Sequence, residues 1–164
     1  MKAYILLVVG SLFLTGCTSS LTSKDLVLNA NSQLDKSQLE MWNYMVGRWY
    51  GNQLMEDGGV RQQITERFND GTYKIIFRYK KPDSKVKEDI EVGQWGIAGP
   101  IYFSIYRGWI DGDKFIPANS SEPSNYNAYK IIHLTNEKFK YKSYSTESVY
   151  SLIKVTNDFT FPDL

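Results

Sequence analysis

The sequence predicts an all-β protein, an eight-stranded antiparallel up-and-down barrel preceded by a short helix. Three observations favour this class. Turn-forming residues recur at regular intervals, apolar and polar side chains alternate between them, and one stretch alone has helical spacing. Strands joined by short turns pair as antiparallel neighbours, and closing such a sheet into a barrel removes its two unpaired edges.

The predicted helix comes first and is one to three turns long. Asp35 can cap its N-terminus, Leu39 and Trp42 fall on one face, and Met45 extends that face. Gly47 ends the helix, and the first strand is expected to follow at this junction.

The eight predicted strands are separated by Asp-Gly, Asn-rich and Pro-containing breaks, which suit positive φ angles or side-chain capping. They cover residues 46–56, 60–69, 72–81, 88–97, 101–110, 126–134, 138–145 and 148–155. Residues 111–113, Asp-Gly-Asp, are predicted as a hairpin turn because the longer spacing of an EF-hand calcium loop is missing. Residues 117–125 are predicted as a longer loop.

Alternation along the strands predicts which side chains face the barrel interior. The predicted ligand-binding set is Tyr73, Phe77, Tyr79, Tyr102, Tyr106, Tyr141 and Glu66. Glu66 is included because it alternates in phase with Ile64 and Phe68. Two interpretations remain open: a ligand cavity with aromatic walls and a few orienting hydroxyls, or a filled core in which tyrosine hydroxyls satisfy one another.

The N-terminus has the parts of an export signal. Lys2 is followed by an apolar run over residues 3–13, which is shorter than the roughly 20 residues of a membrane-spanning helix. Cys17, the single cysteine, follows directly after Leu14-Thr15-Gly16. This "LTGC" segment resembles the lipobox of bacterial lipoproteins.

The lipobox resemblance implies that residues 1–16 are removed and that Cys17 is acylated. Two or more acyl chains hold a protein stably on a membrane, whereas one holds it marginally. Thr18 stands where aspartate would signal inner-membrane retention, so the resemblance implies the outer membrane of a cell envelope, facing the periplasm. Residues 17–34 are then a lipidated, serine- and threonine-rich tether, and residues 35–164 the barrel domain.

A second motif lies where the helix meets the first strand. Gly47 and Trp49, in the order Gly-x-Trp, resemble the signature of lipocalins and the wider calycin group. That resemblance implies a tryptophan that plugs the closed end of the barrel beneath the helix. In the family an arginine from near the last strand packs over this ring. Here the last strand offers Lys154 for this role, and Arg48 and Arg107 are the other candidates. The family's second motif, Thr-Asp-Tyr, is not found.

Composition argues against several functions. Removing residues 1–16 takes away Lys2 and leaves 18 basic against 18 acidic side chains, which gives no basic stripe for nucleic acid. His133 is the single histidine, which disfavours both a zinc site and a Ser-His-Asp triad. The glycines of segment 93–99 lack the spacing of a dinucleotide loop. No metal or cofactor is predicted.

The sequence therefore predicts a membrane-anchored periplasmic binding protein for a small hydrophobic or amphipathic ligand, such as a fatty acid or a lipid-like molecule. The alternative is a protein-binding envelope lipoprotein, an assembly accessory or an inhibitor, with a filled barrel and a functional segment at 117–129. Catalysis is not favoured, although an enzyme built from carboxylates and tyrosines is a competing class. Asp89 and Glu91 share one strand face and are expected to be exposed.

Overall fold

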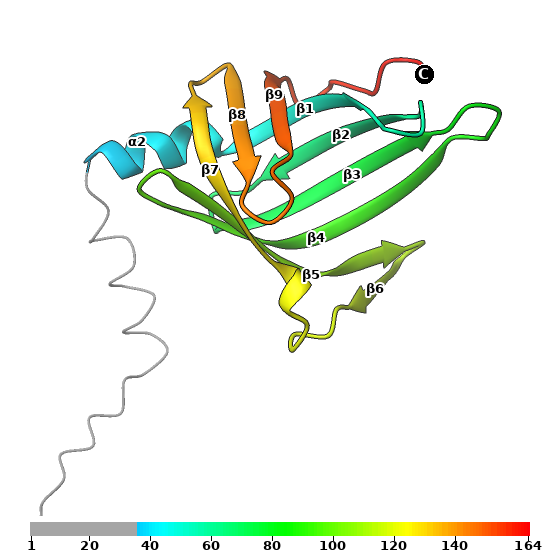
Figure 1. The fold of residues 1–164 in the computed structure, drawn as a ribbon. Coiled ribbons are helices and arrows are strands. Elements are labelled where there is room, and N and C mark those ends of the chain that lie inside the picture. Colours follow the sequence, from blue (N-terminus) through cyan, green and yellow to red (C-terminus); the bar gives the residue numbers. More distant parts are fainter. Residues whose placement is uncertain (1–35) are drawn as a thin grey trace, which may run out of the picture. The chain divides into compact units, whose positions relative to one another are not determined.

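In the computed structural model, which describes residues 36–164, one short helix is followed by nine β-strands (Figure 1). The elements are α2 (Lys36–Met45), β1 (Gly47–Leu54), β2 (Val60–Arg67), β3 (Thr72–Lys80), β4 (Lys87–Ala98), β5 (Ile101–Asp111), β6 (Lys114–Pro117), the 3-10 turn η1 (Pro123–Asn125), β7 (Tyr126–Leu134), β8 (Lys138–Ser143) and β9 (Val149–Val155). The predicted signal peptide, the lipidated Cys17 and its tether, and the Asp35 cap lie outside the described residues.

Eight of the strands form a closed antiparallel barrel. β1 to β5 pair in sequence order, β5 pairs with β7, and β7, β8 and β9 follow one another. The barrel closes where β9 returns to β1, from Arg48 opposite Val155 to Gly51 opposite Leu152. This architecture, with its one short helix, confirms the predicted fold class.

The ninth strand, β6, was not predicted and lies outside the closed ring. β5 is long enough to pair twice, with β7 over Ile101–Ile105 and with β6 over Gly108–Asp111. Gly108 has a φ of +151°, and a side chain there would run into the carbonyl oxygen of Ile116. The four residues of β6 include a proline, so the segment is too short and too poor in alternation to be recognised as a strand.

The Gly-x-Trp segment lies at the end of the barrel next to α2. Trp49 is 0% exposed, and its indole nitrogen donates a hydrogen bond to the Met45 carbonyl at 2.8 Å. Lys154 faces Trp49 across the β1–β9 pair. Its ammonium lies 5.2 Å from the Trp49 ring centroid and donates to the Tyr44 carbonyl at 3.0 Å. Gly47, with a φ of +107°, makes the turn between helix and strand.

The helix packs through the side chains nearest its C-terminal end. Trp42 stacks on Trp95 of β4 with ring centroids 4.1 Å apart, and its indole nitrogen donates to Asn69 at 3.0 Å. Leu39, predicted on the buried face, is 49% exposed, so the buried face is narrower than the spacing suggests. Within residues 36–164, no helix has the length and apolar character needed to cross a bilayer.

Residues 156–164 lie across the outside of β1, β2 and β3. The Phe159 ring packs 5.1 Å from that of Tyr50, and the Gln62 side chain donates a hydrogen bond to the backbone of this segment at 3.3 Å. As a result, Gln62 and Ile64 on the outer face of β2 are only 1% and 3% exposed. β2 is therefore buried on both faces.

Candidate ligand-binding cavity

A cavity of about 150 Å³, the central cavity, lies inside the barrel. Its lining side chains come from seven of the eight barrel strands, with β1 contributing none. They are Arg61, Gln63, Arg67, Tyr73, Ile75, Phe77, Glu91, Tyr102, Ser104, Tyr106, Asn127, Tyr129, Tyr141 and Tyr150. This lining is aromatic and polar, with Ile75 as its aliphatic member. A molecule in the cavity would meet ring faces and hydrogen-bonding groups.

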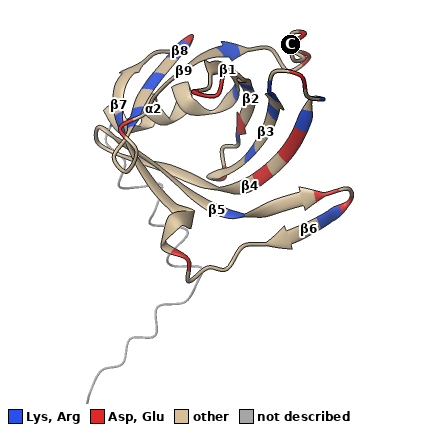
Figure 2. Ribbon diagram, turned by 45° about the vertical axis from the view of Figure 1, so that its right-hand side comes forward, with Lys and Arg blue, Asp and Glu red and all other residues tan. Residues whose placement is uncertain are grey.

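A second cavity of about 260 Å³, the side cavity, lies against β3, β4 and β5. It shares Glu91 and Tyr106 with the central cavity, so the two adjoin. Figure 2 shows the acidic positions along β4, of which Asp89 and Glu91 line the side cavity. The remaining lining includes Tyr79 and Trp109. A ligand larger than the central cavity could extend in this direction.

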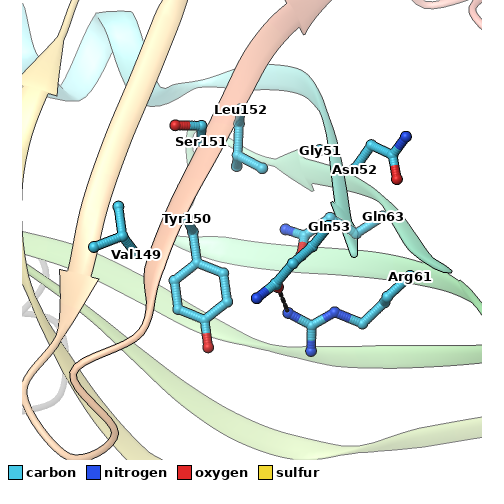
Figure 3. Close-up of a pocket in the computed structure, with 9 residues that line it drawn as sticks. All are labelled: Gly51, Asn52, Gln53, Arg61, Gln63, Val149, Tyr150, Ser151 and Leu152. Carbon is cyan, nitrogen blue, oxygen red and sulfur yellow. Dashed lines mark hydrogen bonds between the residues drawn. The ribbon is translucent and has the colours of Figure 1, made fainter. Parts of the chain in front are cut away.

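The wall between β1 and β9 opens where their pairing stops at Gly51 and Leu152. Beyond that point a cavity of about 120 Å³ separates the two strands (Figure 3). Arg61 donates a hydrogen bond to Gln53 at 2.7 Å here, and its guanidinium lies 5.7 Å from the Tyr150 ring centroid. Arg61 and Tyr150 also line the central cavity, so this gap adjoins the barrel interior.

The structure brings six of the seven predicted ligand-binding residues to these cavities. The central cavity is lined by Tyr73, Phe77, Tyr102, Tyr106 and Tyr141. Tyr79 lines the side cavity instead, with its ring stacked 5.8 Å from that of Phe77. Alternation along β3, β5 and β8 was therefore sufficient to place these side chains inside.

Glu66 is the exception, and its predicted inward orientation is wrong. The side chains of β2 that line the central cavity are Arg61, Gln63 and Arg67, and Glu66 alternates with them. The error came from Ile64, whose burial was expected to mark the interior. Ile64 is buried on the outer face of β2, the face on which residues 156–164 contact Gln62, so the apolar phase of β2 faces outward.

Several cavity residues were not singled out from the sequence. Arg67 is 1% exposed, although charged side chains are rarely buried without a partner. Glu91, predicted to be exposed, is half-buried and lines both cavities. Tyr129 and Tyr150 also lie inside. The sequence pattern that could have identified them is the alternation of side chains along each strand. Alternation assigns residues to two faces but does not show which face lines the barrel interior.

Aromatic rings from β5, β7, β8 and β9 form one continuous wall, here called the tyrosine wall. Its members are Tyr102, Tyr129, Phe139, Tyr141 and Tyr150. Phe139 stacks 4.5 Å from Tyr141, and Tyr141 stacks 5.1 Å from Tyr150. Such mutually packed rings hold one another in place, and all of them except Phe139 line the central cavity.

Two hydroxyls of this wall, those of Tyr129 and Tyr141, remain protonated near neutral pH. Burial raises the pKa of Tyr129 to about 12 and raises the pKa of Tyr141 further. Burial likewise raises the pKa of Tyr73, on the opposite side of the cavity. Each group is therefore a neutral phenol that can donate or accept a hydrogen bond, and none supplies a negative charge.

Arg67 lies among these rings. Its Nη2 donates a hydrogen bond to the Tyr102 hydroxyl at 3.2 Å. Its guanidinium carbon lies 5.0 Å from the Tyr102 ring centroid and 5.3 Å from that of Phe139. These distances are within the range of cation–π interactions, which favour arginine over other cations.

Burial raises the pKa of Glu91, whose carboxylate would lose hydration inside the barrel. The positive charge of Arg61 opposes this shift, and the negative charge of Asp89 adds to it. Because the ionised form is less favourable in the folded protein than in the unfolded chain, Glu91 lowers stability wherever it is ionised.

We expect the Glu91→Gln variant to be more stable than the native protein, by an amount that increases as pH rises. Below the ordinary pKa near 4.5, Glu91 is protonated in both folded and unfolded states and contributes nothing. Above 4.5 the unfolded chain ionises first, and the native protein loses stability until the raised pKa is passed. Glutamine does not ionise, so the variant escapes this loss. The melting temperature of Glu91→Gln minus that of the native protein should therefore be larger at pH 7 than at pH 4.

Asp113→Asn is the matched control, because Asp113 is an exposed acid in the β5–β6 turn. It removes one negative charge without altering the cavity. A difference between Glu91→Gln and the native protein that does not vary with pH would contradict the assignment of Glu91 to a buried site.

His133 is exposed on β7 and is not among the side chains that line the central cavity, to which β7 contributes Asn127 and Tyr129. In the part of the chain that the structure describes, no group of three or more His, Cys, Asp or Glu side chains is placed to hold a metal ion. No protein-family model matches this chain, and no curated protein matches it.

Proposed function

We propose that this chain is a lipid-anchored protein of the bacterial cell envelope whose barrel binds one small amphipathic molecule. The observation that carries the proposal is the pair of adjoining cavities, about 150 and 260 Å³, inside and beside the barrel wall. Protein cores are normally packed to crystal-like density with few voids. Cavities lined by aromatic rings with a few polar groups are typical of small-molecule sites.

The volume of the central cavity limits the size of the ligand. A cavity of about 150 Å³ accommodates a molecule the size of benzene, whereas pockets for drug-sized ligands are about 300–1,000 Å³. A single ring or a short chain therefore suits the central cavity, with any further part in the side cavity. This supports a small amphipathic ligand over a long-chain fatty acid.

One observation favours the alternative function, binding of another protein. The β5–β6 hairpin lies outside the closed ring and exposes large apolar side chains, Trp109 at 42% and Phe115 at 52%. Tyr126, in the predicted functional segment 117–129, is 51% exposed. Trp109 pairs with Ile116 and Phe115 with Ile110, so the two rings lie on opposite faces of the hairpin. Large apolar side chains exposed on a projecting hairpin can mark a protein interface.

The test is native mass spectrometry of the full chain purified from its own host envelope, followed by extraction of bound molecules. We expect one small molecule per chain. Tyr106→Trp should abolish its recovery, because Tyr106 lines both cavities and a larger ring would fill them. Phe103→Trp is the matched control, since Phe103 lies on the outer face of the same strand and is 36% exposed.

Repeated recovery of an empty chain would contradict the ligand-binding proposal and leave protein binding as the better account. Equal loss of the molecule in Tyr106→Trp and Phe103→Trp would also contradict it, because the outer-face change does not reach the cavities.

A further inference from the structure

Arg67 is a buried cation without an acidic partner. The ion pairs among residues 36–164 join Arg78 to Glu88, Lys81 to Asp57 and Lys142 to Glu147, all at the surface. Arg67 itself is 1% exposed. Its Nη2 is hydrogen-bonded to Tyr102, but its Nε and Nη1 have no hydrogen-bonding partner in the described part of the chain.

Such an arrangement is unfavourable unless something else compensates it. A guanidinium group is not neutralised by losing its proton in proteins, so its charge has to be compensated by other groups. The rings of Tyr102 and Phe139 stabilise the charge through their faces, but they do not accept hydrogen bonds from Nε and Nη1. A buried charge left unpaired loses its hydration without replacement.

The other groups that line the central cavity do not neutralise Arg67. Tyr73 and Tyr141 feel its positive charge, yet burial keeps both as neutral phenols. Glu91 is the one carboxyl group in the lining, and the arginine that acts on its pKa is Arg61. The lining therefore carries two guanidinium groups and one carboxyl group, with the excess positive charge at Arg67.

We propose that Arg67 is the anion-binding group of the central cavity and that the ligand is a small organic anion with a flat apolar body. This inference rests on the proposed function, because it names the chemical class of the molecule that the barrel takes up. The anionic group would accept hydrogen bonds from Arg67, and the body of the molecule would lie against the tyrosine wall.

The chemistry of the site favours a carboxylate on a single ring. Guanidinium groups match the planar geometry of carboxylates, and hydrogen bonds between ionised partners are about twice as strong as neutral ones. The rings of the wall offer faces and edges for an aromatic body. A molecule with one ring also matches the cavity volume of about 150 Å³.

The experiment compares two probes of the same shape, sodium benzoate and the neutral benzamide, by isothermal titration of the full chain in detergent at constant ionic strength. The variants are Arg67→Met, which keeps length without charge, and Arg67→Lys, which keeps charge without the planar group. Arg107→Met is the matched control, since Arg107 is exposed on the outer face of β5 and bonded to Gln94.

We expect the native protein to bind benzoate more tightly than benzamide by about 10- to 100-fold, the ratio for a hydrogen-bonded charged group. Arg67→Met should lose this preference, Arg67→Lys should retain part of it, and Arg107→Met should keep it whole. Benzoate, and not benzamide, should also raise the melting temperature of the native protein. If Arg67→Met does not fold, the test is whether the preference for benzoate over benzamide is smaller in Arg67→Lys than in the native protein.

Equal affinity of the native protein for benzoate and benzamide would overturn the anion site and leave the proposed function standing. Binding of neither probe would also overturn the anion site, and mass spectrometry of the chain from its host envelope would then decide the proposed function separately. A preference for benzoate that survives in Arg67→Met would assign the charge recognition to another residue and overturn the inference.

Discussion

Replacing Trp49 with alanine is expected to lower the free energy of unfolding by about 3 to 5 kcal/mol, the range for a large buried aromatic side chain. Trp49 is 0% exposed and packs against Phe139, with ring centroids 6.0 Å apart. The change would also leave the Met45 carbonyl without its indole donor and would remove the ring beneath the Lys154 ammonium. Denaturant unfolding followed by fluorescence and circular dichroism measures the loss.

Trp109→Ala is the matched control, because Trp109 lies on the β5–β6 hairpin and is 42% exposed. It should change the free energy of unfolding by less than about 1 kcal/mol, as expected for a surface position. If Trp49→Ala cost no more than this control, Trp49 would not be the plug of the closed end. The Gly-x-Trp resemblance would then be accidental.

Replacing Cys17 with serine is expected to release the chain from the membrane fraction or to leave it unprocessed. The lipobox resemblance implies acyl chains on Cys17, whose thiol serine lacks, and each buried methylene contributes about 0.8 kcal/mol to membrane binding. Metabolic labelling with palmitate and fractionation of the cell envelope measure the outcome.

Thr18→Asp is the informative companion to Cys17→Ser. It leaves the acylated cysteine in place, so labelling should persist, while the lipoprotein resemblance implies a shift from the outer to the inner membrane. Palmitate labelling of Cys17→Ser at the level of the native protein would contradict lipid anchoring at this residue.

The barrel could be predicted from the sequence because its signals are local. Asp-Gly and Asn-rich breaks mark where strands end, and the alternation of Tyr73, Phe77 and Tyr79 marks one face of β3. β6 was missed because four residues with a proline are too few to show a period. Helical spacing puts Leu39 on the same face of α2 as Trp42, which predicts that it is buried. How much of that face is buried depends on the shape of the barrel end that it contacts, and this the helix sequence does not contain.

The site was predicted in part, and its errors have one physical cause. Tyr102, Tyr106 and Tyr141 lie on strands with one wet face, so alternation was enough to place them. β2 is buried on both faces, so the alternation of its side chains does not show which face lines the barrel interior. That is why Glu66 was assigned to the interior and Arg67 was not.

By itself, the sequence determined the strand count of the closed ring, the position of Trp49 at the junction of helix and barrel, and the aromatic character of the interior. Each of these depends on residues close to one another along the chain. Tertiary structure decided which face of β2 is inside, because residues 156–164 return to the outer face of β2, where Gln62 donates to the Pro162 carbonyl 100 positions away. It also decided that Arg67 is buried and Glu91 half-buried, and that the rings leave a cavity. A cavity is the small difference between the space that the closed barrel encloses and the volume of the side chains within it, and no local pattern determines that difference.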